Sequence, residues 1–261
     1  TETGDSIKAN RLRIVDTLGS PCFNAPRAVA RTGRHSVAKA LAPIDGLQVP
    51  RTELIEARSG ADLVARIEAA GLRYPLLLRA PGMHVGATMA KVDAPDAVDA
   101  AVFDMPLQRR GTYVTEFVDY RDADGLYRKM RLVVVGRQVF LRHFVIANGW
   151  HVHVRDRLRK DDPEETRMLD GFPVSLPMDA TALALQVADA LDLDFFGIDC
   201  CPRPDGRLLM FEANAALAGV MAAPVYQVSQ QMGADLIIVV FAVVVMGGTG
   251  SILGSIVTGC G

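Results

Sequence analysis

The feature that most constrains this chain is an acidic hairpin motif between Phe195 and Ala215, with the sequence FFGIDCCPRPDGRLLMFEANA. Two short apolar runs flank a segment that contains Pro202, Pro204, Asp205 and Gly206, which are residues typical of turns. Asp-Gly is also a strong signal for the tight turn of a β-hairpin. The motif therefore predicts two antiparallel strands that lie side by side.

The register of this hairpin follows if Asp205–Gly206 is a two-residue loop. Asp199 then lies directly opposite Glu212, and Gly197 lies opposite Asn214. Because successive side chains of a strand alternate between its faces, both carboxylates and the Asn214 amide share one face. The same register pairs Pro204 with Arg207 and Cys201 with Met210, and it puts on the other face Ile198, Cys200, Leu209, Phe211 and Ala213.

Two carboxylates placed opposite each other on a sheet repel, so this pairing needs a compensating positive charge. A hard divalent cation supplies one, and Mg²⁺ accepts carboxylate and amide oxygens, with water and nucleotide phosphates as its further ligands. The hairpin thus predicts a metal site at Asp199, Glu212 and Asn214. The alternatives are that the acids are solvated surface residues, or that an asymmetric loop shifts the register.

The composition limits the class of protein. Of the 261 residues, 50% are hydrophobic, which is ample for a core, and a formal net charge of -2 gives no general attraction to nucleic acid or to an anionic membrane. The four cysteines form no CxxC pair, and residues 1–20 are too polar for a signal peptide. We therefore expect a reducing compartment, a cytoplasmic location and no nucleic-acid partner.

Outside the middle of the chain, helical and strand patterns alternate. Apolar periodicity and capping residues mark the helices, and short apolar runs mark the strands. The expected helices cover 59–71 (capped by Ser59), 94–103 and 179–191 (capped by Asp179), the expected strands cover 74–79 and 89–92, and a charged loop covers 160–167.

The loop between the strands 74–79 and 89–92 contains Gly82 and Gly86. Such a loop can cover phosphates with backbone N–H groups. It is not a P-loop, because GK[ST] is absent, and it is not a Rossmann fingerprint, because no GxGxxG opens a helix. An ordinary hairpin turn is the alternative.

The middle of the chain has the pattern of an antiparallel meander. Asn-Gly is among the best two-residue hairpin signals, and one such pair separates the last two strands. The expected strands cover 113–118, 127–135, 139–147 and 150–154, and the last three are joined by turns at Gly136–Arg137 and Asn148–Gly149.

With these turns, three arginines share one face of the meander: Arg131 pairs with Arg142, and Arg142 pairs with Arg155. Adjacent arginines repel unless an anion lies among them, and the guanidinium group suits phosphate oxygens. The alternative is a solvent-facing sheet whose long side chains lie over apolar neighbours. His151 and His153 share this face, but a zinc site there needs further ligands.

The order of these motifs resembles the ATP-grasp fold over about residues 21–216. YPLLLRAPGMHVGATMAKV is similar to the family's strand, glycine-rich lid and return strand, TEFV to its hinge, and GIDCC together with FEANA to its metal signature. The resemblance implies an α+β fold with antiparallel sheets and flanking helices in two subdomains, followed here by an apolar C-terminal tail. Two positions where the family usually has a basic residue, commonly lysine, hold Arg34 and Arg79.

The resemblance also implies roles for individual residues, with ATP and Mg²⁺ as cofactors. Asp199, Glu212 and Asn214 are the implied metal ligands, and Arg131 resembles the arginine of the family's central strands. Together with Arg131, the neighbouring Arg142 and Arg155 are the expected catalytic arginines. The expected nucleotide-binding residues are Arg34, Arg79, Gly82, Gly86, Glu116, Phe117, Val118 and, at the ribose, Asp124 or Asp122.

Within the family, FNAPRAVARTGR, TEFVDYRDADGLYRKMR and FEANA are most similar to bacterial ATP-grasp domains attached to tetratricopeptide-repeat proteins. The implied organisation is a remnant of a preceding domain over 1–30, an ATP-grasp domain over 31–225 with a lid subdomain over about 73–113, and a separate tail over 232–261.

The tail differs in character from the rest, because no charged residue occurs from Leu236 to Gly261. It resembles a segment of the membrane permeases of branched-chain amino acid ABC transporters. Its fully apolar run, Leu236 to Met246, is shorter than the roughly 20 residues that span a bilayer. The open interpretations are a membrane anchor, a buried part of the core, or a junction of unrelated pieces.

The ATP-grasp resemblance implies ATP-dependent activation of a carboxylate to an acyl phosphate, which an amine or thiol then attacks. The expected partners are ATP and an unidentified small-molecule carboxylate or amine, with a membrane only if the tail inserts. Two other hypotheses remain: a nucleotide-binding module without turnover, and a membrane-attached fragment related to amino acid permeases.

Overall fold

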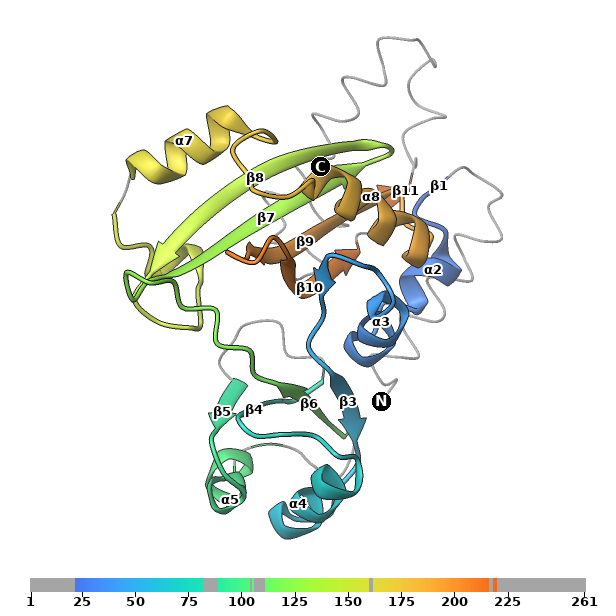
Figure 1. Ribbon diagram of the computed structural model, residues 1–261. Helices are drawn as coiled ribbons and strands as arrows, with labels where there is room; N and C mark the ends of the chain where they lie inside the picture. Colours follow the sequence, from blue (N-terminus) through green and yellow to red (C-terminus); the bar gives the residue numbers. More distant parts are fainter. Residues whose placement is uncertain are drawn as a thin grey trace, which may run out of the picture.

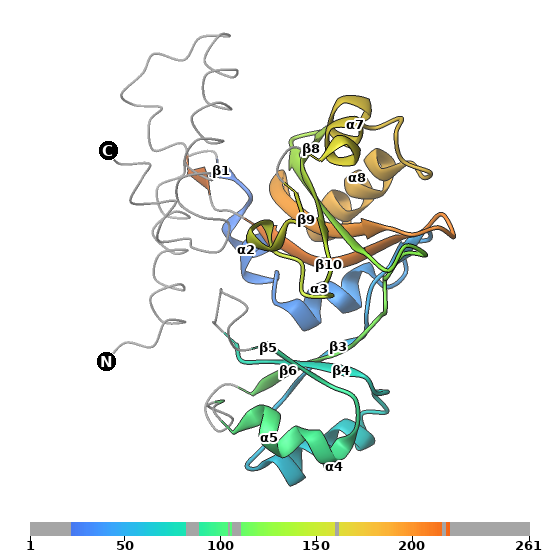
Figure 2. The same cartoon turned by 90° about the vertical axis from the view of Figure 1, so that its left-hand side faces the viewer.

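The computed structural model describes residues 22–81, 89–103, 105, 111–159, 162–215 and 218–219. It contains two main β-sheets, each of which packs against its own helices, and the smaller sheet lies below the larger one in Figures 1 and 2. The predicted α+β architecture, with helices flanking largely antiparallel sheets, is confirmed. The predicted loop at Gly82 and Gly86 and the predicted tail over 232–261 lie outside the described residues.

The larger sheet contains, in spatial order, β2 (Leu47–Gln48), β10 (Leu208–Ala215), β9 (Phe195–Pro202), β7 (Tyr127–Val135) and β8 (Gln138–Ala147). Neighbouring strands are antiparallel, except that β2 runs parallel to β10. Alternate residues such as Met130, Leu132 and Ile198 are buried in one core with side chains from four helices. These helices are α2 (Pro26–Ala30), α3 (Arg34–Leu41), α7 (Pro163–Gly171) and α8 (Ala180–Leu191).

The smaller sheet contains, in spatial order, β3 (Thr52–Ile55), β6 (Thr112–Glu116), β4 (Leu76–Arg79) and β5 (Met89–Val92). The helices α4 (Gly60–Ala69) and α5 (Val98–Val102), the latter preceded by the 3-10 turn η2 (Pro95–Ala97), cover its outer face. Leu76 and Leu78 are buried against these helices, so by alternation Leu77 and Arg79 face the larger sheet.

Capping residues begin α4 and α8 where the sequence predicts. The Ser59 hydroxyl accepts a hydrogen bond from the N–H of Asp62 at 3.1 Å, and the Asp179 carboxylate accepts one from the N–H of Ala182 at 2.9 Å. Each of these bonds satisfies an N–H that lacks an intrahelical partner. The charged segment predicted as a loop over 160–167 is instead largely helical, because Asp162 caps α7 and Pro163 occupies its first turn.

The β9–β10 hairpin has the predicted register only near the acids. Asp199 pairs with Glu212, but a β-bulge at Phe211 shifts the register, so that Cys201 pairs with Leu209. The predicted pairs of Cys201 with Met210 and of Pro204 with Arg207 are wrong, because the loop is longer and closes with the N–H of Arg203 on the carbonyl of Arg207 at 2.8 Å.

This bulge also changes which side chains share a face. Leu209 and Phe211 pack in an apolar cluster with Cys201, on the face that carries Asp199 and Glu212. The prediction that Leu209 and Phe211 face away from the acids is therefore wrong, since a bulge places two successive residues on one side of the strand.

A second bulge interrupts the β7–β8 pair. Gly136–Arg137 forms the turn, as predicted, but the extra residue Arg142 shifts the register so that Arg131 pairs with His143. The Arg142 side chain is exposed. The prediction that Arg131 pairs with Arg142 is wrong for this reason.

The segment after β8 is not a strand, which corrects the prediction over 150–154. The 3-10 turn η3 (Val154–Asp156) begins there, and the His153 ring caps it by accepting a hydrogen bond from the N–H of Arg155 at 3.2 Å. Arg155 is exposed in this turn, so it does not pair with Arg142.

Among the described residues, no helix is both long enough and apolar enough to cross a membrane.

Asn24 connects the N-terminal part of the described chain to the larger sheet. It follows the short strand β1 (Cys22–Phe23), which pairs with β11 (Ala218–Gly219), and its side chain is fully buried. The Asn24 Oδ1 atom accepts hydrogen bonds from the N–H groups of Asp194 and Phe195, both at 2.8 Å, and Nδ2 donates to the carbonyl of Phe195. Its φ of 64° lies in the left-handed region.

We expect Asn24→Ala to lower the free energy of unfolding by about 3 kcal/mol, because it leaves buried N–H groups without partners and strains a left-handed residue. Asn24→Gly removes the same hydrogen bonds but tolerates the backbone conformation, so it should cost about 1 kcal/mol less. Urea titrations of both variants measure the two contributions. Equal costs for Ala and Gly would contradict the backbone contribution.

Candidate functional site

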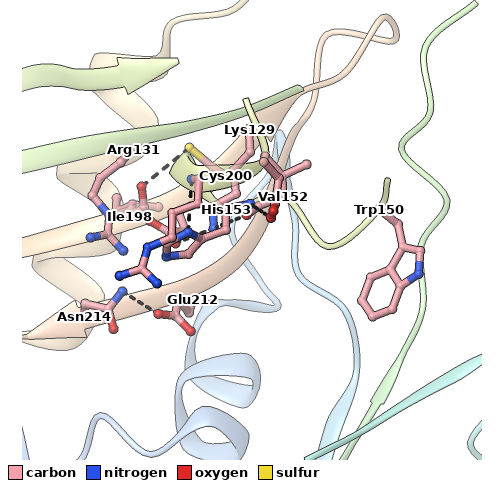
Figure 3. A network of polar contacts seen from close by, with 12 residues as sticks. Lys129, Arg131, Trp150, Val152, His153, Ile198, Cys200, Glu212 and Asn214 are labelled. Atoms are coloured by element: carbon pink, nitrogen blue, oxygen red, sulfur yellow. Dashed lines mark hydrogen bonds and ion pairs between the residues drawn. The ribbon is translucent and has the colours of Figure 1, made fainter. Parts of the chain in front are cut away.

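The site centres on the predicted pair of opposed carboxylates. Asp199 of β9 and Glu212 of β10 are direct cross-strand partners, and Gly197 and Asn214 are partners two residues further along. Asp199 is 4% exposed, and Glu212 is partly buried. Figure 3 shows Glu212 and Asn214 side by side on β10, close to Arg131. The sequence prediction that these three oxygen-bearing residues meet on one face is confirmed.

Two cations from β7 hold Asp199. The Lys129 ammonium lies 2.9 Å from Oδ2, and the Arg131 Nε–H donates to Oδ1, so both carboxylate oxygens are engaged. Lys129 and Arg131 stand two residues apart on the strand, and alternation therefore puts both on the same face. The Arg131 side chain passes over Gly197, where a Cβ would meet its Cδ and Nε at 3.8 Å.

Glu212 is held from the other side of the site. Arg34, the first residue of α3, donates to Oε2, and Arg79 at the end of β4 lies 3.8 Å from the same oxygen. The Asn214 Nδ2 group donates to Oε1 at 2.6 Å. Arg79 belongs to the smaller sheet, so Glu212 is also a point where the two subdomains make contact.

These cations change the ionisation of the two acids. Burial alone would raise the pKa of Asp199, but Lys129 and Arg131 outweigh it and hold this pKa below its ordinary value. Burial likewise opposes ionisation of Glu212, and Arg34 lowers its pKa below the ordinary value. Both side chains are therefore anions at neutral pH.

The donor set suits a hard cation. Two opposed carboxylates and one amide oxygen match the preference of Mg²⁺, which usually completes its coordination with water and phosphate oxygens. No group of three or more His, Cys, Asp and Glu side chains that could hold a metal occurs in the described part of the chain, and this includes His151 and His153. A metal at the site would therefore use two acids, Asn214 and ligands from outside the protein.

An apolar and aromatic surface borders the charged cluster. Val118, Trp150 and Phe211 pack against the buried side chains of Tyr120 and Leu209. The rings of Phe117 and Trp150 meet edge to face at 5.6 Å, and the Lys91 ammonium of β5 lies 4.9 Å above the Phe117 ring. Such a surface suits a flat ring, because aromatic and aliphatic side chains can contact both its edge and its face.

The segment from Glu116 to Val118 begins at the last residue of β6 and crosses between the two sheets. The Glu116 carboxylate accepts from the N–H of Arg73 at 3.0 Å, so its side chain points toward the outer loop. Within the described residues, the N–H of Val118 donates no hydrogen bond, which leaves backbone groups of this segment for a ligand. A cavity of about 490 Å³ lies here, lined by Gln48, Val49, Pro50, Arg51, Arg73, Tyr74, Glu116, Phe117 and Val118.

The remaining predicted residues lie elsewhere. Asp124 is bound to Arg128, whose guanidinium also contacts Asp122 and Glu164, and the hydrogen bonds from Arg128 lower the pKa of Asp124 to about 2. Arg142 is exposed beside its bulge, and Arg155 is exposed in η3. Gly82 and Gly86 lie outside the described residues. The structure thus brings together Arg34, Arg79, Arg131, Asp199, Glu212 and Asn214. Glu116, Phe117 and Val118 line the separate cavity at the crossing between the sheets.

The sequence reasoning missed Lys129, Lys91 and Trp150. The position of Lys129, two residues before Arg131 in a predicted strand, was sufficient to place it on the same face. It also missed His143, which takes the place predicted for Arg142 opposite Arg131. Burial lowers the pKa of His143 to about 4, so its ring is neutral at pH 7.

The sequence matches one protein-family model. The family model described as the RimK-like ATP-grasp domain matches residues 34–237, a range that contains both sheets and every predicted site residue. No curated protein matches the sequence significantly.

Several solved structures are similar. One is the carboxyaminoimidazole ribonucleotide synthase of Aspergillus clavatus complexed with ATP, at 16% identity and a TM-score of 0.48 over 73% of this chain and 46% of that one. Another is the ATP-grasp ligase PsnB complexed with precursor peptide PsnA2 and AMPPNP, at 17% identity and a TM-score of 0.47 over 85% of this chain and 64% of that one. The VanG D-Ala:D-Ser ligase of Enterococcus faecalis shows 16% identity and a TM-score of 0.44 over 69% and 50% of the two chains. The chain spans about half the length of the first structures it matches.

The charge pairs at the site predict a pH-dependent stability. We expect Asp199→Asn to lower the free energy of unfolding at pH 7 by about 3–5 kcal/mol, because it leaves the buried Arg131 and the partly buried Lys129 without their anion. The pKa of Asp199 is lower in the folded than in the unfolded chain, so its stabilisation is present above the unfolded value of about 3.9 and is lost as the pH falls through the folded value.

Urea titrations at pH 7, 5 and 3 check this prediction, and the difference between wild type and variant should shrink only at the lowest pH. The control is Asp189→Asn, which breaks the exposed pair with Arg137 and should change stability by less than about 0.5 kcal/mol. A difference of the same size at pH 3 and pH 7 would contradict the assignment.

Proposed function

Because the chain belongs to the RimK-like ATP-grasp family, as the sequence resemblance predicted at the level of the superfamily, we propose that it binds Mg·ATP between its two sheets. The observation that supports this most is the cluster in which Arg34, Arg79 and Arg131 surround the opposed acids Asp199 and Glu212. Polyphosphate and a divalent cation together satisfy such a mixture of opposite charges.

We assign the metal-facing role to Asp199, Glu212 and Asn214, whose oxygens fit a hard cation. When bound, Mg²⁺ neutralises phosphate charge and holds the triphosphate in place. Arg34, Arg79 and Arg131 bind phosphate oxygens as charge develops on them. Arg142 and Arg155 are not part of this assignment, because neither lies beside Arg131 in the sheet.

The base and ribose lie along the segment from Glu116 to Val118. The N–H of Val118 faces the base edge, because that of Phe117 already donates to the carbonyl of Pro75, and the apolar surface of Val118, Trp150 and Phe211 supports its flat face. Asp124 contacts the ribose only if it exchanges its contact with Arg128. The role of Gly82 and Gly86 stays a prediction from the sequence, since both lie outside the described residues.

The reaction proposed is the one that the family resemblance implies. A carboxylate oxygen attacks the γ-phosphorus of ATP and releases ADP, which gives an acyl phosphate. An amine nitrogen, or a thiol sulfur, then attacks the acyl carbon, the C–O bond to phosphate breaks, and phosphate leaves while the nucleophile loses a proton. In this chain, the described cations would stabilise the departing phosphate.

A nucleotide-binding module without turnover is the alternative. Measuring ADP release with mixtures of carboxylates and amines distinguishes the two. Stable ATP binding without ADP release favours the module.

Three finer predictions stay proposals. We propose that the nearest relatives are ATP-grasp domains attached to tetratricopeptide-repeat proteins, that the protein is cytoplasmic, and that the tail over 232–261 is a permease-like segment joined to the domain. Comparing the partition between membrane and buffer of the full chain with that of residues 1–230 tests the last of these. Equal solubility of both would exclude a membrane anchor.

We expect saturating Mg·ATP, at about 100 times its Kd, to raise the Tm of the wild type by roughly 5–10 °C, since such binding contributes about 2.7 kcal/mol. The double variant Asp199→Ala/Glu212→Ala should lose the part of this rise that depends on Mg²⁺, because its metal ligands are gone while its phosphate-binding cations remain. Thermal unfolding with Mg·ATP and with ATP plus EDTA measures this part for each protein.

The matched control is Asp189→Ala/Asp205→Ala, which removes two acids from exposed ion pairs elsewhere and should keep the full rise. Circular dichroism establishes that each variant is folded before the comparison. An equal rise in both double variants would discard the metal assignment.

A further inference from the structure

Lys129 has no role in the function proposed above, yet it is in direct contact with Asp199. Its ammonium contacts the Asp199 carboxylate at 2.9 Å and donates to the backbone carbonyl of Val152 at 3.2 Å. Lysine carries three donors on a flexible stem, so it can exchange one anionic partner for another without moving the backbone. Lys129 therefore connects the acid pair to the segment after β8.

The charges of the cluster are not balanced. Among the described residues, the three cations Arg34, Lys129 and Arg131 are in direct contact with only two carboxylates, so positive charges outnumber negative ones at these contacts. A free divalent cation that approaches this cluster is repelled, whereas an anion is attracted. The charge excess therefore favours phosphate before metal.

The metal ligands are also engaged. Lys129 and Arg131 each take one oxygen of Asp199, and Arg34 and Asn214 each take one oxygen of Glu212. A metal ion can bind only if some of these cations shift toward another anion. Lys129 can shift by rotating its flexible stem, whereas the Arg131 side chain is packed over Gly197.

We propose that Lys129 is an exchangeable counter-ion that occupies Asp199 in the empty site and moves to phosphate when the triphosphate binds, so that metal binding depends on prior anion binding. This inference rests on the proposed function and adds to it a positioning residue and an order of binding. It implies that a polyphosphate alone binds and that a divalent cation alone does not.

The chain contains a built-in reporter for this exchange. Trp150 is its one tryptophan, and it lies two residues from Val152 and in edge contact with Phe117. Its backbone carbonyl accepts a hydrogen bond from the Tyr120 hydroxyl. Figure 3 shows Lys129 and Val152 between Glu212 and Trp150. Release of Val152 by Lys129 should therefore change the fluorescence of Trp150.

The experiment titrates the full chain with three probes: MnCl₂ alone, inorganic tripolyphosphate with EDTA, and both without EDTA. Bound Mn²⁺ is counted by electron paramagnetic resonance, and Trp150 fluorescence and Tm report the anion. For the wild type we expect tripolyphosphate alone to bind, Mn²⁺ alone not to bind at millimolar concentration, and Mn²⁺ to bind in the presence of tripolyphosphate.

Lys129→Met should shift the two affinities in opposite directions. It frees Asp199 Oδ2 and removes one positive charge, so Mn²⁺ alone should bind roughly tenfold tighter or more, while tripolyphosphate should bind several-fold weaker. The control Lys39→Met removes a lysine that pairs with Glu53 on the surface and should behave as the wild type. A merely structural role of Lys129 would weaken both ligands together.

Two outcomes overturn the proposal: unchanged or weaker Mn²⁺ binding in Lys129→Met, and failure of tripolyphosphate to bind the wild type without metal. A parallel titration with Mg·ATP distinguishes failure of the Lys129 exchange from failure of the proposed nucleotide binding. If the wild type responds to Mg·ATP but Lys129→Met gains no affinity for metal, only the exchange is wrong. If the wild type does not respond to Mg·ATP, the nucleotide site itself is wrong.

Discussion

The structure depends on cations that offset the repulsion between two neighbouring carboxylates. Asp199 and Glu212 face each other across a hairpin, where like charges are unfavourable. The chain compensates with cations from three directions: β7 supplies Lys129 and Arg131, α3 supplies Arg34, and the smaller sheet supplies Arg79. The acid pair therefore holds together elements that are far apart in the sequence, and the same charges make the site suitable for a metal and a polyphosphate.

Much of the fold and the centre of the site could be predicted from local sequence. The Asp-Gly turn and alternation place Asp199 opposite Glu212 in the prediction, and this pairing holds because the extra residue of the bulge at Phe211 offsets the longer loop. The capping residues Ser59 and Asp179 likewise mark the starts of their helices, since a cap is a contact within one turn.

The errors come from irregularities that no local pattern specifies. A bulge adds one residue to one strand, and the sequence contains no sign of where it falls, so the faces of Leu209 and Phe211 and the partner of Arg131 were predicted wrongly. The contacts of Arg34 and Arg79 with Glu212 depend on the packing of separate elements, and only the family resemblance indicated that these arginines belong together.

The two sheets are joined by two neighbouring segments. The N–H of Glu116 donates to the carbonyl of Arg51 at 2.9 Å, and the N–H of Phe117 donates to the carbonyl of Pro75 at 2.9 Å, so the crossing points lie close together. Such a junction acts as a narrow axis: turning the smaller sheet about it would displace atoms near the axis little and those farther out much more. Arg79 contacts Glu212 at 3.8 Å and lies away from this axis. A small change in the angle between the sheets would therefore alter the distance from Arg79 to Glu212 before it altered the hydrogen bonds at the junction.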